Sequence, residues 1–442
     1  MKMTAQPTPQ KYDGNLYVLS RHPDRWDNVT RPFSPDQVQR LRPVVANDPT
    51  IARYTAERFW ELLKRNEGVR GFGVDNPVEA VNAVRGGNEV AYLSGWMVAA
   101  NANDQVLPDM GLYGDRDGSI LVRRLNAAFD GAAKVDRLAY GEDSIDWCVP
   151  IVADIEAGFG GINNVHELTR DMIYAGVASV HIEDQDPSSK RCGHMAGKAV
   201  IPTSTFIDKL VATRLTADIY GTPTVIIART DALAAKFIVG YTDDMEETDG
   251  KYIRSSGMDG RFEFGDPQGQ GHNLEAAIAR GRAYAKYADV LWMETGTPDL
   301  GVALEFLQGV REEAPWAEFT YNMSPSFNWA ANLSNREIDE FADKLVEMGY
   351  CYPFSTLPEW RQKGVTAFED AERFNTPGDG MGFLRDIQAR EKRAESRGYK
   401  GTNHQTAVGS EFFDNFGTAV QGDRMKNAAG GSESTEHQFK DN

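Results

Sequence analysis

Cysteine is scarce in this sequence: Cys148, Cys192 and Cys351 are the three among 442 residues. An odd number of widely spaced cysteines argues against a disulfide framework and is typical of a reducing compartment. The chain also lacks an uninterrupted apolar run long enough to span a membrane, and residues 1–14 lack the apolar segment of a secretory signal. The last residues, QFKDN, are not a peroxisomal address. We therefore expect a cytoplasmic protein with no membrane partner.

Positive charge is also in short supply. Lys and Arg number 47 against 65 Asp and Glu, which gives a formal net charge of −18. Such a surface repels a phosphate backbone, so we expect no nucleic-acid partner. A small anionic metabolite is still compatible, because a locally basic pocket or a divalent cation can hold it. The hydrophobic fraction of 41% is typical of a globular protein with a sizeable core.

Short apolar or β-branched runs recur along the middle of the chain, with amphipathic helical patterns in several of the intervals. The runs lie at residues 69–73, 89–96, 148–156, 179–185, 224–231, 289–296, 319–325 and 351–357. Strands that alternate with helices form parallel βαβ units. Eight such strands predict a fold of the α/β class, a closed (β/α)8 barrel of the TIM type.

Composition and periodicity divide the chain into five parts. We predict an N-terminal arm at 1–33, N-terminal helices at 34–68 with Ser34 and Asp48 as caps, the catalytic barrel at 69–360, a C-terminal helical region at 361–420, and a flexible tail at 421–442. The alternating charges of the C-terminal region suit a solvated or subunit-spanning face. Residues 242–273 are assigned no role.

Polar side chains end almost every one of the eight runs. They are Ser94, Asp154, Glu156, His181, Glu183, Arg229, Asp231, Glu294, Asn322, Ser324 and Thr356. Active sites of barrels collect at the carboxyl ends of the strands. This pattern favours the barrel over an open sheet, and it predicts one shared pocket.

Four carboxylates belong to this predicted rim: Asp109, Asp154, Glu156 and Glu183. Converging carboxylates repel one another unless a cation lies among them. Oxygen ligands without a Cys/His cluster favour Mg²⁺ or Mn²⁺ over zinc. Each acid alone is better explained as a helix cap or as the partner of a basic residue, and only their joint placement favours a metal site.

Groups for an anionic substrate accompany the acids. Arg229 can hold a carboxylate through two parallel hydrogen bonds. Neutral donors for a second carboxylate are Asn322, Ser324, Ser326 and Thr356, and the turn Ser94, Gly95 and Trp96 offers backbone amides. Individually, serine and asparagine at a strand end are more often turn formers.

The run EDQDPSSKRCGHMAGK, residues 183–198, has the period of neither a helix nor a strand. It places Cys192 near Lys190, Arg191 and His194, and neighbouring positive charge favours a thiolate. A surface loop with a chance cysteine is the simpler alternative. A metal, anion-binding groups and an acid–base thiol together indicate a lyase or aldolase-type reaction on a multi-carboxylate, with the substrate open.

The segments KRCGH, ADIEAGFGG, HIEDQ, YLSGW and WMETGTPDL…YNMSPSFNW resemble isocitrate lyase, and the likeness runs from about Pro35 to Val420. The resemblance implies cleavage of isocitrate to succinate and glyoxylate, as in the glyoxylate cycle, with Mg²⁺ or Mn²⁺. It also implies a homotetramer that exchanges helices between subunits. The sequence departs from the family at Arg191, usually Lys, at Ile155, usually small, and at Met97, more commonly Gln.

The resemblance assigns roles to individual residues. Asp154 binds the metal directly, while Asp109, Glu156 and Glu183 hold its water. The glyoxylate part of the substrate meets Ser94, Gly95, Trp96 and Arg229. The succinate part meets Gly193, His194, Asn322, Ser324, Ser326 and Thr356. In the catalytic set of Cys192, Tyr92, His194 and Arg229, Cys192 protonates the succinate carbanion and Tyr92 handles the hydroxyl proton.

Two alternatives stay open. A 2-methylisocitrate lyase yields pyruvate instead of glyoxylate, and the extra methyl of its substrate changes binding by only about 1–3 kcal/mol. A barrel that binds a di- or tricarboxylate without turning it over belongs to another class. Loss of the thiol, of a metal acid or of Arg229 would indicate that second alternative, and all of them are present.

Overall fold

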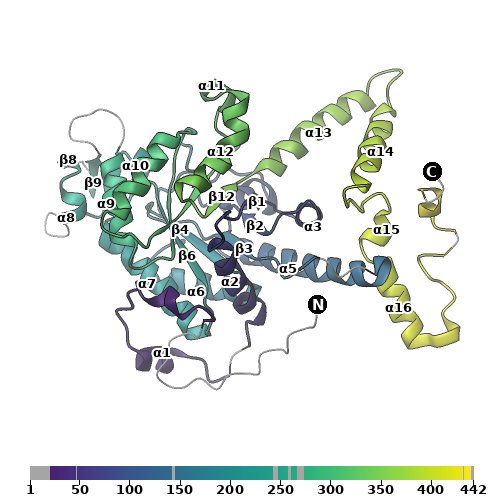
Figure 1. The fold of residues 1–442 in the computed structure, drawn as a ribbon, viewed down its shortest axis with the longest axis horizontal. Coiled ribbons are helices and arrows are strands. Elements are labelled where there is room, and N and C mark those ends of the chain that lie inside the picture. Colours follow the sequence, from purple (N-terminus) through teal and green to yellow (C-terminus); the bar gives the residue numbers. More distant parts are fainter. Residues whose placement is uncertain are drawn as a thin grey trace.

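The centre of the molecule is a closed barrel of eight parallel strands (Figure 1). The computed structural model describes residues 20–45, 47–141, 145–241, 247–256, 260–265, 273–431 and 433–439. Around the barrel the order is β1-β12-β11-β10-β6-β4-β3-β2. The strands are β1 (Gly71–Gly73), β2 (Val90–Leu93), β3 (Ile151–Asp154), β4 (Ser179–Glu183), β6 (Val225–Thr230), β10 (Val290–Met293), β11 (Glu318–Asn322) and β12 (Tyr352–Ser355). Each predicted run overlaps one barrel strand, and only β11 begins one residue before its run, so the predicted (β/α)8 class is confirmed.

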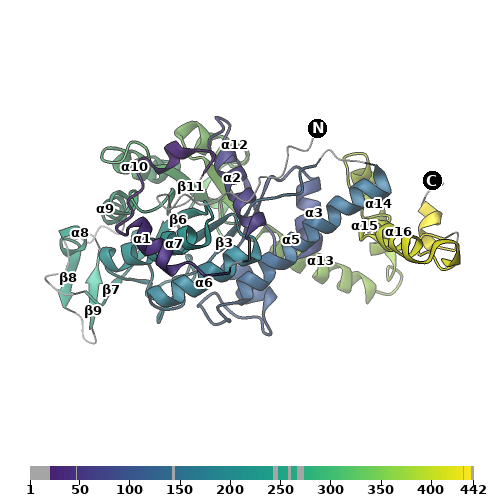
Figure 2. The same ribbon diagram turned by 90° about the horizontal axis from the view of Figure 1, so that it is seen from below.

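Helices surround the barrel on its outer side (Figures 1 and 2). They are α3 (Pro77–Arg85), α5 (Asp117–Val135), α6 (Ile162–Ala175), α7 (Thr203–Tyr220), α9 (Leu274–Tyr284), α10 (Leu300–Arg311) and α12 (Asn335–Met348). The short helices α4 (Gly95–Met97) and α11 (Trp329–Asn332) follow strands β2 and β11 in the chain. Side chains cap several of them. The Ser334 hydroxyl accepts from the Glu337 amide at the start of α12, and Asp299 accepts from two amides of α10. These caps fix where the helices start and so where the loops above the barrel lie.

The N-terminal helices are α1 (Pro35–Leu41) and α2 (Thr50–Leu63). Ser34 caps α1 as predicted, in a capping box with Gln37. The prediction of Asp48 as a cap is wrong. Pro49 occupies the N-cap position of α2, so the Asp48 carboxylate lies one residue too early and instead accepts from Arg53 Nη2 at 2.7 Å.

Large aromatic side chains fill the barrel below its carboxyl end. The Tyr92 and Phe354 rings lie 4.4 Å apart between centroids, and those of Trp292 and Phe354 lie 5.1 Å apart. Phe59 and Trp60 of α2 belong to the same buried cluster. The barrel interior is therefore packed, and space for a ligand is left above these rings.

A second, smaller sheet lies on the side of the barrel away from the C-terminal helices (Figures 1 and 2). Its order is β5-β7-β9-β8, from β5 (Ala199–Val200), β7 (Phe237–Val239), β8 (Ile253–Ser256) and β9 (Arg261–Phe264), and α8 (Glu247–Gly250) lies beside it. We did not predict this sheet. Much of the segment 242–273 lies outside the described residues.

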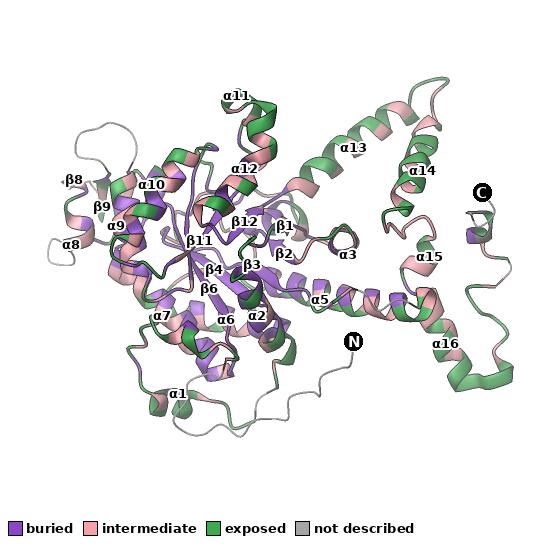
Figure 3. Cartoon of the chain, viewed as in Figure 1, coloured by how far each residue is buried: buried purple, intermediate pink, exposed green. Residues whose placement is uncertain are grey.

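The C-terminal helices project from the barrel (Figures 1 and 3). They are α13 (Pro358–Phe374), α14 (Gly382–Glu395), α15 (His404–Ala407) and α16 (Ser410–Gln421), followed by 3-10 turns at Gly422–Arg424 and Thr435–Phe439. None of these four helices contains a buried residue. Across the described ranges, no helix has the length and apolar character needed to cross a membrane.

Candidate active site

A pocket lies at the carboxyl ends of the barrel strands. It is lined by Tyr92, Ser94, Trp96, Asp109, Asp154, Cys192, Gly193, His194, Arg229, Trp292, Glu294, Asn322, Thr356 and Leu357. The lining does not include Gly95, Glu156, Glu183, Ser324 or Ser326; Ser324 is buried and Ser326 is exposed. The cavity volume is about 20 Å³. That space accommodates one water molecule and no tricarboxylate, so a substrate enters only after part of the wall moves.

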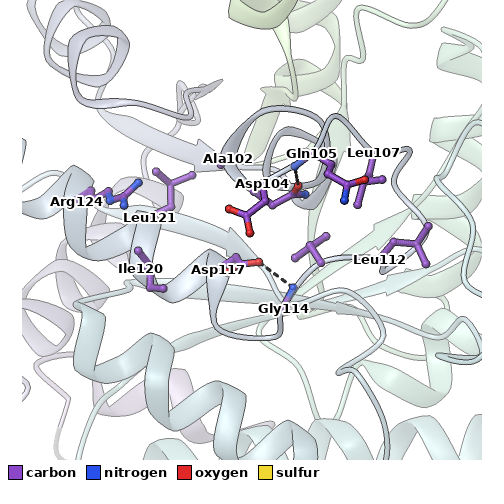
Figure 4. A pocket seen from close by; sticks show the side chains of 12 residues that line it. Ala102, Asp104, Gln105, Leu107, Leu112, Gly114, Asp117, Ile120, Leu121 and Arg124 are labelled. Atoms are coloured by element: carbon purple, nitrogen blue, oxygen red, sulfur yellow. Dashed lines mark hydrogen bonds between the residues drawn. The ribbon is translucent and has the colours of Figure 1, made fainter.

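A larger cavity of about 400 Å³ lies outside this pocket, between residues 102–114 and the first half of α5 (Figure 4). The Gly114 amide donates to Asp117 there at 2.8 Å. Tyr113 lines the larger cavity and donates its hydroxyl to Glu156, one of the predicted metal acids. The lining of the larger cavity contains none of the predicted site residues, so we place the site in the smaller one.

Asp154, the last residue of β3, organises the turn that follows its strand. Its carboxylate accepts from the backbone amides of Glu156 at 2.7 Å and of Gly95 at 3.0 Å. Glu156 has a φ of 53°, a left-handed conformation that is uncommon for a residue with a side chain, and its carboxylate accepts from the Tyr113 hydroxyl. Burial opposes ionisation of Asp154, but nearby His181, Lys190 and Arg229 outweigh it and lower its pKa. Asp154 is therefore a carboxylate at neutral pH.

Lys190 places its ammonium group among the acids. Its Nζ contacts the carboxylates of both Asp109 and Glu156, and all three side chains are buried. Burial would lower the pKa of Lys190, but Asp109 and Glu156 raise it well above its usual value. Among the described residues, no group of three or more His, Cys, Asp or Glu has the arrangement of a metal site. In this conformation, an ammonium group thus supplies the positive charge that these acids require.

Glu183, at the end of β4, retains an unpaired oxygen. Its Oε1 is buried and has no hydrogen-bond partner among the residues that the structure describes, while Oε2 lies 3.2 Å from Arg229 Nη1. Burial raises the pKa of Glu183 to about 8. A buried carboxyl oxygen without a partner is costly, and a cation or its hydration shell would satisfy it.

Arg229, near the end of β6, is surrounded by acceptors. Its Nε donates to Asp231 at 2.9 Å, and Glu294 Oε2 lies 3.9 Å away. The guanidinium also lies over the Trp292 ring at 4.5 Å. Burial would lower the pKa of Arg229, but Asp231 and Glu183 keep it well above the usual value. The charge is permanent and its direction is fixed, which suits recognition of a carboxylate.

Tyr92 and His181 form a hydrogen-bonded pair in the floor of the pocket. Tyr92 Oη lies 2.9 Å from His181 Nε2, and His181 Nδ1 lies 3.6 Å from Asp154 Oδ1. Burial lowers the pKa of His181 to about 4 and raises that of Tyr92 well above 10. Both side chains are therefore neutral at pH 7, and the pair can pass a proton along its hydrogen bond.

Cys192 lies in a loop whose backbone is held on both sides. Gln185 is hydrogen-bonded to the backbone of Arg191, and Lys198 donates to the Gly193 carbonyl. Our prediction that neighbouring cations favour the thiolate is wrong for this conformation. Burial and Asp109 raise the pKa of Cys192 to about 12, because Lys190 contacts the acids rather than the sulfur. The group is a neutral thiol, which is the protonated form that a proton donor needs.

Sequence reasoning missed several residues of this site. Asp231 and Glu294 were recognised only as polar strand ends, yet they bind Arg229 and His194; the His194 Nε2–Glu294 Oε1 distance is 3.1 Å. His181 had a similar signal, since it stands two residues before Glu183 in the same strand and so faces the same side. No feature of the sequence predicted the contact of Lys190 with Asp109 and Glu156.

The fold and the pocket define a class: a (β/α)8 barrel with acids, a buried arginine and a cysteine loop gathered at the carboxyl ends of its strands. The model of the isocitrate lyase family matches residues 20–257 and 265–439, and the chain belongs to that family.

Curated relatives match over nearly the whole chain. Identity is 41% over 435 residues with an isocitrate lyase of Corynebacterium efficiens, covering 97% of this chain and 96% of that one. It is 40% over 421 residues with one of Halalkalibacterium halodurans, covering 94% and 95%, and 40% over 426 residues with one of Escherichia coli, covering 94% and 96%.

Solved structures support the fold alone. A 2,3-dimethylmalate lyase of the PEP mutase/isocitrate lyase superfamily has a TM-score of 0.51 at 21% identity, covering 79% of this chain and 96% of that one. An oxaloacetate acetylhydrolase has a TM-score of 0.53 at 21% identity, covering 78% and 98%.

Proposed function

We propose that this chain is a carbon–carbon lyase that cleaves isocitrate to succinate and glyoxylate, a step of the glyoxylate cycle. Identity of about 40% with curated isocitrate lyases over more than nine tenths of the chain supports this activity. The observation that carries it is the convergence of Cys192, Arg229 and Asp154 on one small pocket. In this proposal the thiol is the proton donor, the guanidinium binds a substrate carboxylate, and the carboxylate binds a divalent cation.

The acids fit a divalent cation, Mg²⁺ or Mn²⁺. The donors are hard oxygens, and Glu183 Oε1 is a buried oxygen without a partner in the described parts of the chain. Asp154 would bind the cation directly, and Asp109, Glu156 and Glu183 would hold its water. When bound, the cation polarises the substrate hydroxyl and carries the charge that develops there.

The proton of the substrate hydroxyl passes to Tyr92. Its phenol oxygen accepts that proton while its own proton moves to His181 Nε2, 2.9 Å away. The hydroxyl carbon becomes the carbonyl of glyoxylate, and the bond to the neighbouring carbon breaks with its electron pair left on that carbon. Arg229 holds the glyoxylate carboxylate, with its guanidinium oriented by Asp231.

Cys192 ends the reaction by donating its thiol proton to the carbanion of succinate. A pKa raised to about 12 keeps the proton on sulfur until a strongly basic carbon is formed. Thr356 Oγ1 is buried without a hydrogen-bond partner in the described structure, so its hydroxyl can donate to the succinate part, and Asn322 lines the same pocket. Gly193 and His194 complete that side, with Ser324 and Ser326 on the adjoining loop. On the opposite side, Ser94, Gly95 and Trp96 meet glyoxylate.

The loop around Cys192 acts as a lid. The 20 Å³ cavity is too small for isocitrate, so the loop opens for entry and closes over the bound substrate. Closure excludes water, which would otherwise protonate the carbanion without Cys192.

The assembly we propose is a homotetramer with exchanged C-terminal helices. Exposed apolar side chains on these helices and the adjoining turns support it: Val365, Phe368, Phe374, Met381, Val408, Phe413, Phe416 and Val420. A monomer would leave this face in water at a high cost. We place the enzyme in the cytoplasm, which agrees with three free cysteines.

A direct assay tests this function. Purified protein is incubated with Mg²⁺ and either isocitrate or 2-methylisocitrate, and glyoxylate and pyruvate are measured separately. We expect glyoxylate from isocitrate and its loss in Cys192→Ser. Pyruvate alone, formed from 2-methylisocitrate, would assign the other lyase activity, and no product from either would indicate a carboxylate-binding protein.

A further inference from the structure

Two buried side chains hold the peptide groups on either side of Cys192. The Gln185 amide donates to the Arg191 carbonyl at 2.8 Å and accepts from the Arg191 backbone N–H at 3.0 Å. The Lys198 ammonium donates to the Gly193 carbonyl at 2.7 Å. Gln185 is 0% exposed and Lys198 1% exposed. Gln185, at the start of the loop, thus holds Arg191, and Lys198, at its end, holds Gly193.

Lys198 also connects the loop to the arginine of the site. Its Nζ lies 2.7 Å from Asp231 Oδ1, and Asp231 Oδ2 accepts from Arg229 Nε at 2.9 Å. One carboxylate therefore anchors both the guanidinium and, through Lys198, the Gly193 carbonyl. A buried ammonium is tolerated only where it is paired, and Lys198 uses its protons on these two acceptors.

Gly193 lies directly against the same arginine. A Cβ atom added at this residue would lie 2.8 Å from Arg229 Nη2 and 2.4 Å from Glu294 Oε1. The backbone of the loop is therefore packed directly against Arg229 and Glu294. A shift of the Gly193 peptide would carry the Cys192 sulfur away from the pocket.

We propose that Gln185 and Lys198 are positioning residues that hold Cys192 over the reacting carbon. Neither of them lines the pocket, so each acts through the backbone next to the cysteine. This inference rests on the proposed function, because it assigns both residues to the proton transfer made by Cys192. A purely structural role would instead lower the stability of the protein without displacing the thiol.

Three variants separate these two roles. Lys198→Met keeps the length of the aliphatic side chain and removes the hydrogen bonds to the Gly193 carbonyl and to Asp231. Gln185→Glu is isosteric, keeps an acceptor for the Arg191 amide and removes the donor to its carbonyl, so it tests the same idea if the first variant does not fold. Arg85→Met is the matched control, because it breaks a buried pair with Asp136, 2.6 Å apart, on the outer helices.

The first measurement does not depend on the substrate. A neutral alkylating reagent is added, and mass spectrometry of peptides measures labelling of Cys192 and of the exposed Cys148 separately. We expect faster labelling of Cys192 in Lys198→Met and Gln185→Glu than in wild type, with Cys148 unchanged in all proteins. Arg85→Met should label at the wild-type rate at both cysteines.

The second measurement is turnover of isocitrate with Mg²⁺. We expect kcat to fall about 100-fold in both loop variants, the loss that a displacement of about 1 Å produces. KM should stay within about twofold, since Asp231 still orients Arg229. Wild-type labelling rates at Cys192 together with wild-type kcat would overturn the inference. A wild-type enzyme that does not cleave isocitrate would contradict the proposed function alone, because the labelling comparison still decides whether the two residues position the thiol.

Discussion

The phenol oxygen of Tyr92 lies 2.9 Å from Nε2 of His181, and the two rings are nearly parallel with centroids 5.6 Å apart. Tyr92 comes from β2 and His181 from β4, so the pair spans the strand that ends in Asp154. When Tyr92 takes the proton of the substrate hydroxyl and passes its own to His181, His181 becomes a buried imidazolium, and the Asp154 carboxylate, 3.6 Å from His181 Nδ1, offsets that charge. This relationship supports our proposal that Tyr92 accepts the hydroxyl proton of the substrate.

Tyr92→Phe is expected to lower kcat by about 10²- to 10⁴-fold, the usual contribution of a positioned acid–base group. KM for isocitrate should change little, because the ring and its packing remain. Tyr352→Phe is the matched control: the Tyr352 hydroxyl is also buried in the barrel, but it has no hydrogen-bond partner in the part of the chain that is described. Steady-state kinetics of the two variants check this, and near-normal kcat for Tyr92→Phe would remove Tyr92 from the mechanism.

Chelation of divalent cations is expected to abolish turnover, and Mg²⁺ or Mn²⁺ should restore it. Asp154→Ala should not recover at moderate metal concentration, because it removes the carboxylate that we propose as the direct ligand. Binding of Mn²⁺ measured by electron paramagnetic resonance gives a readout separate from activity, and it should weaken in the same variant. Full activity in excess chelator would contradict the metal assignment.

Cys192→Ser is expected to fold normally and bind substrate but to lose most turnover, since a hydroxyl is a much weaker acid than a thiol. The pH dependence of alkylation checks the state of the thiol in wild type. Burial raises the pKa of Cys192 to about 12, so the rate should still be rising with pH at pH 9. A rate that is already constant above pH 7 would indicate a thiolate and contradict this assignment. Bound succinate and glyoxylate should slow the reaction by closing the lid.

Most of the barrel and part of the site could be predicted from the sequence. Eight short runs with polar ends are a local pattern, and strand position alone brings residues such as Asp154 and Arg229 to one rim. The sequence did not predict which charged side chains form ion pairs with one another. Lys190 was expected to face Cys192, its near neighbour in sequence, but it contacts Asp109, 81 residues away. Such pairing depends on side-chain reach and burial, which no local spacing encodes.

The 3-10 turn Pro23–Trp26 is anchored to the amino-terminal end of the barrel through a buried ion pair. Arg25 Nη2 lies 3.0 Å from Asp289 Oδ2, and both side chains are almost completely buried. Arg25→Met should lower the free energy of unfolding by about 3–5 kcal/mol, because it leaves a buried charge with one partner fewer. Chemical denaturation measures this, with the exposed Arg336→Met as a control near zero. A loss of unfolding free energy in Arg25→Met no larger than that in Arg336→Met would contradict this prediction.

The same pair predicts a pH dependence. Burial opposes ionisation of Asp289, but Arg214 and Arg25 outweigh it and hold its pKa well below the usual range. A depressed folded-state pKa gives stability that is present above the unfolded value of about 3.9 and is lost as pH falls below it. Asp289→Asn should therefore flatten the fall in stability on acidification, and an unchanged pH profile would contradict this.

The exposed face of α16 should be covered by other subunits. Phe413 and Phe416 are 67% and 61% exposed, and each stands on a helix without a buried residue. Light scattering at micromolar protein is expected to give the mass of four chains. A double substitution, Phe413→Glu with Phe416→Glu, should shift that mass toward smaller species, because it places charges in an apolar contact. Val44→Glu, at a fully exposed position outside these helices, should leave the mass unchanged. A monomer mass for the wild-type protein would contradict the tetramer and would leave the projecting helices to another partner.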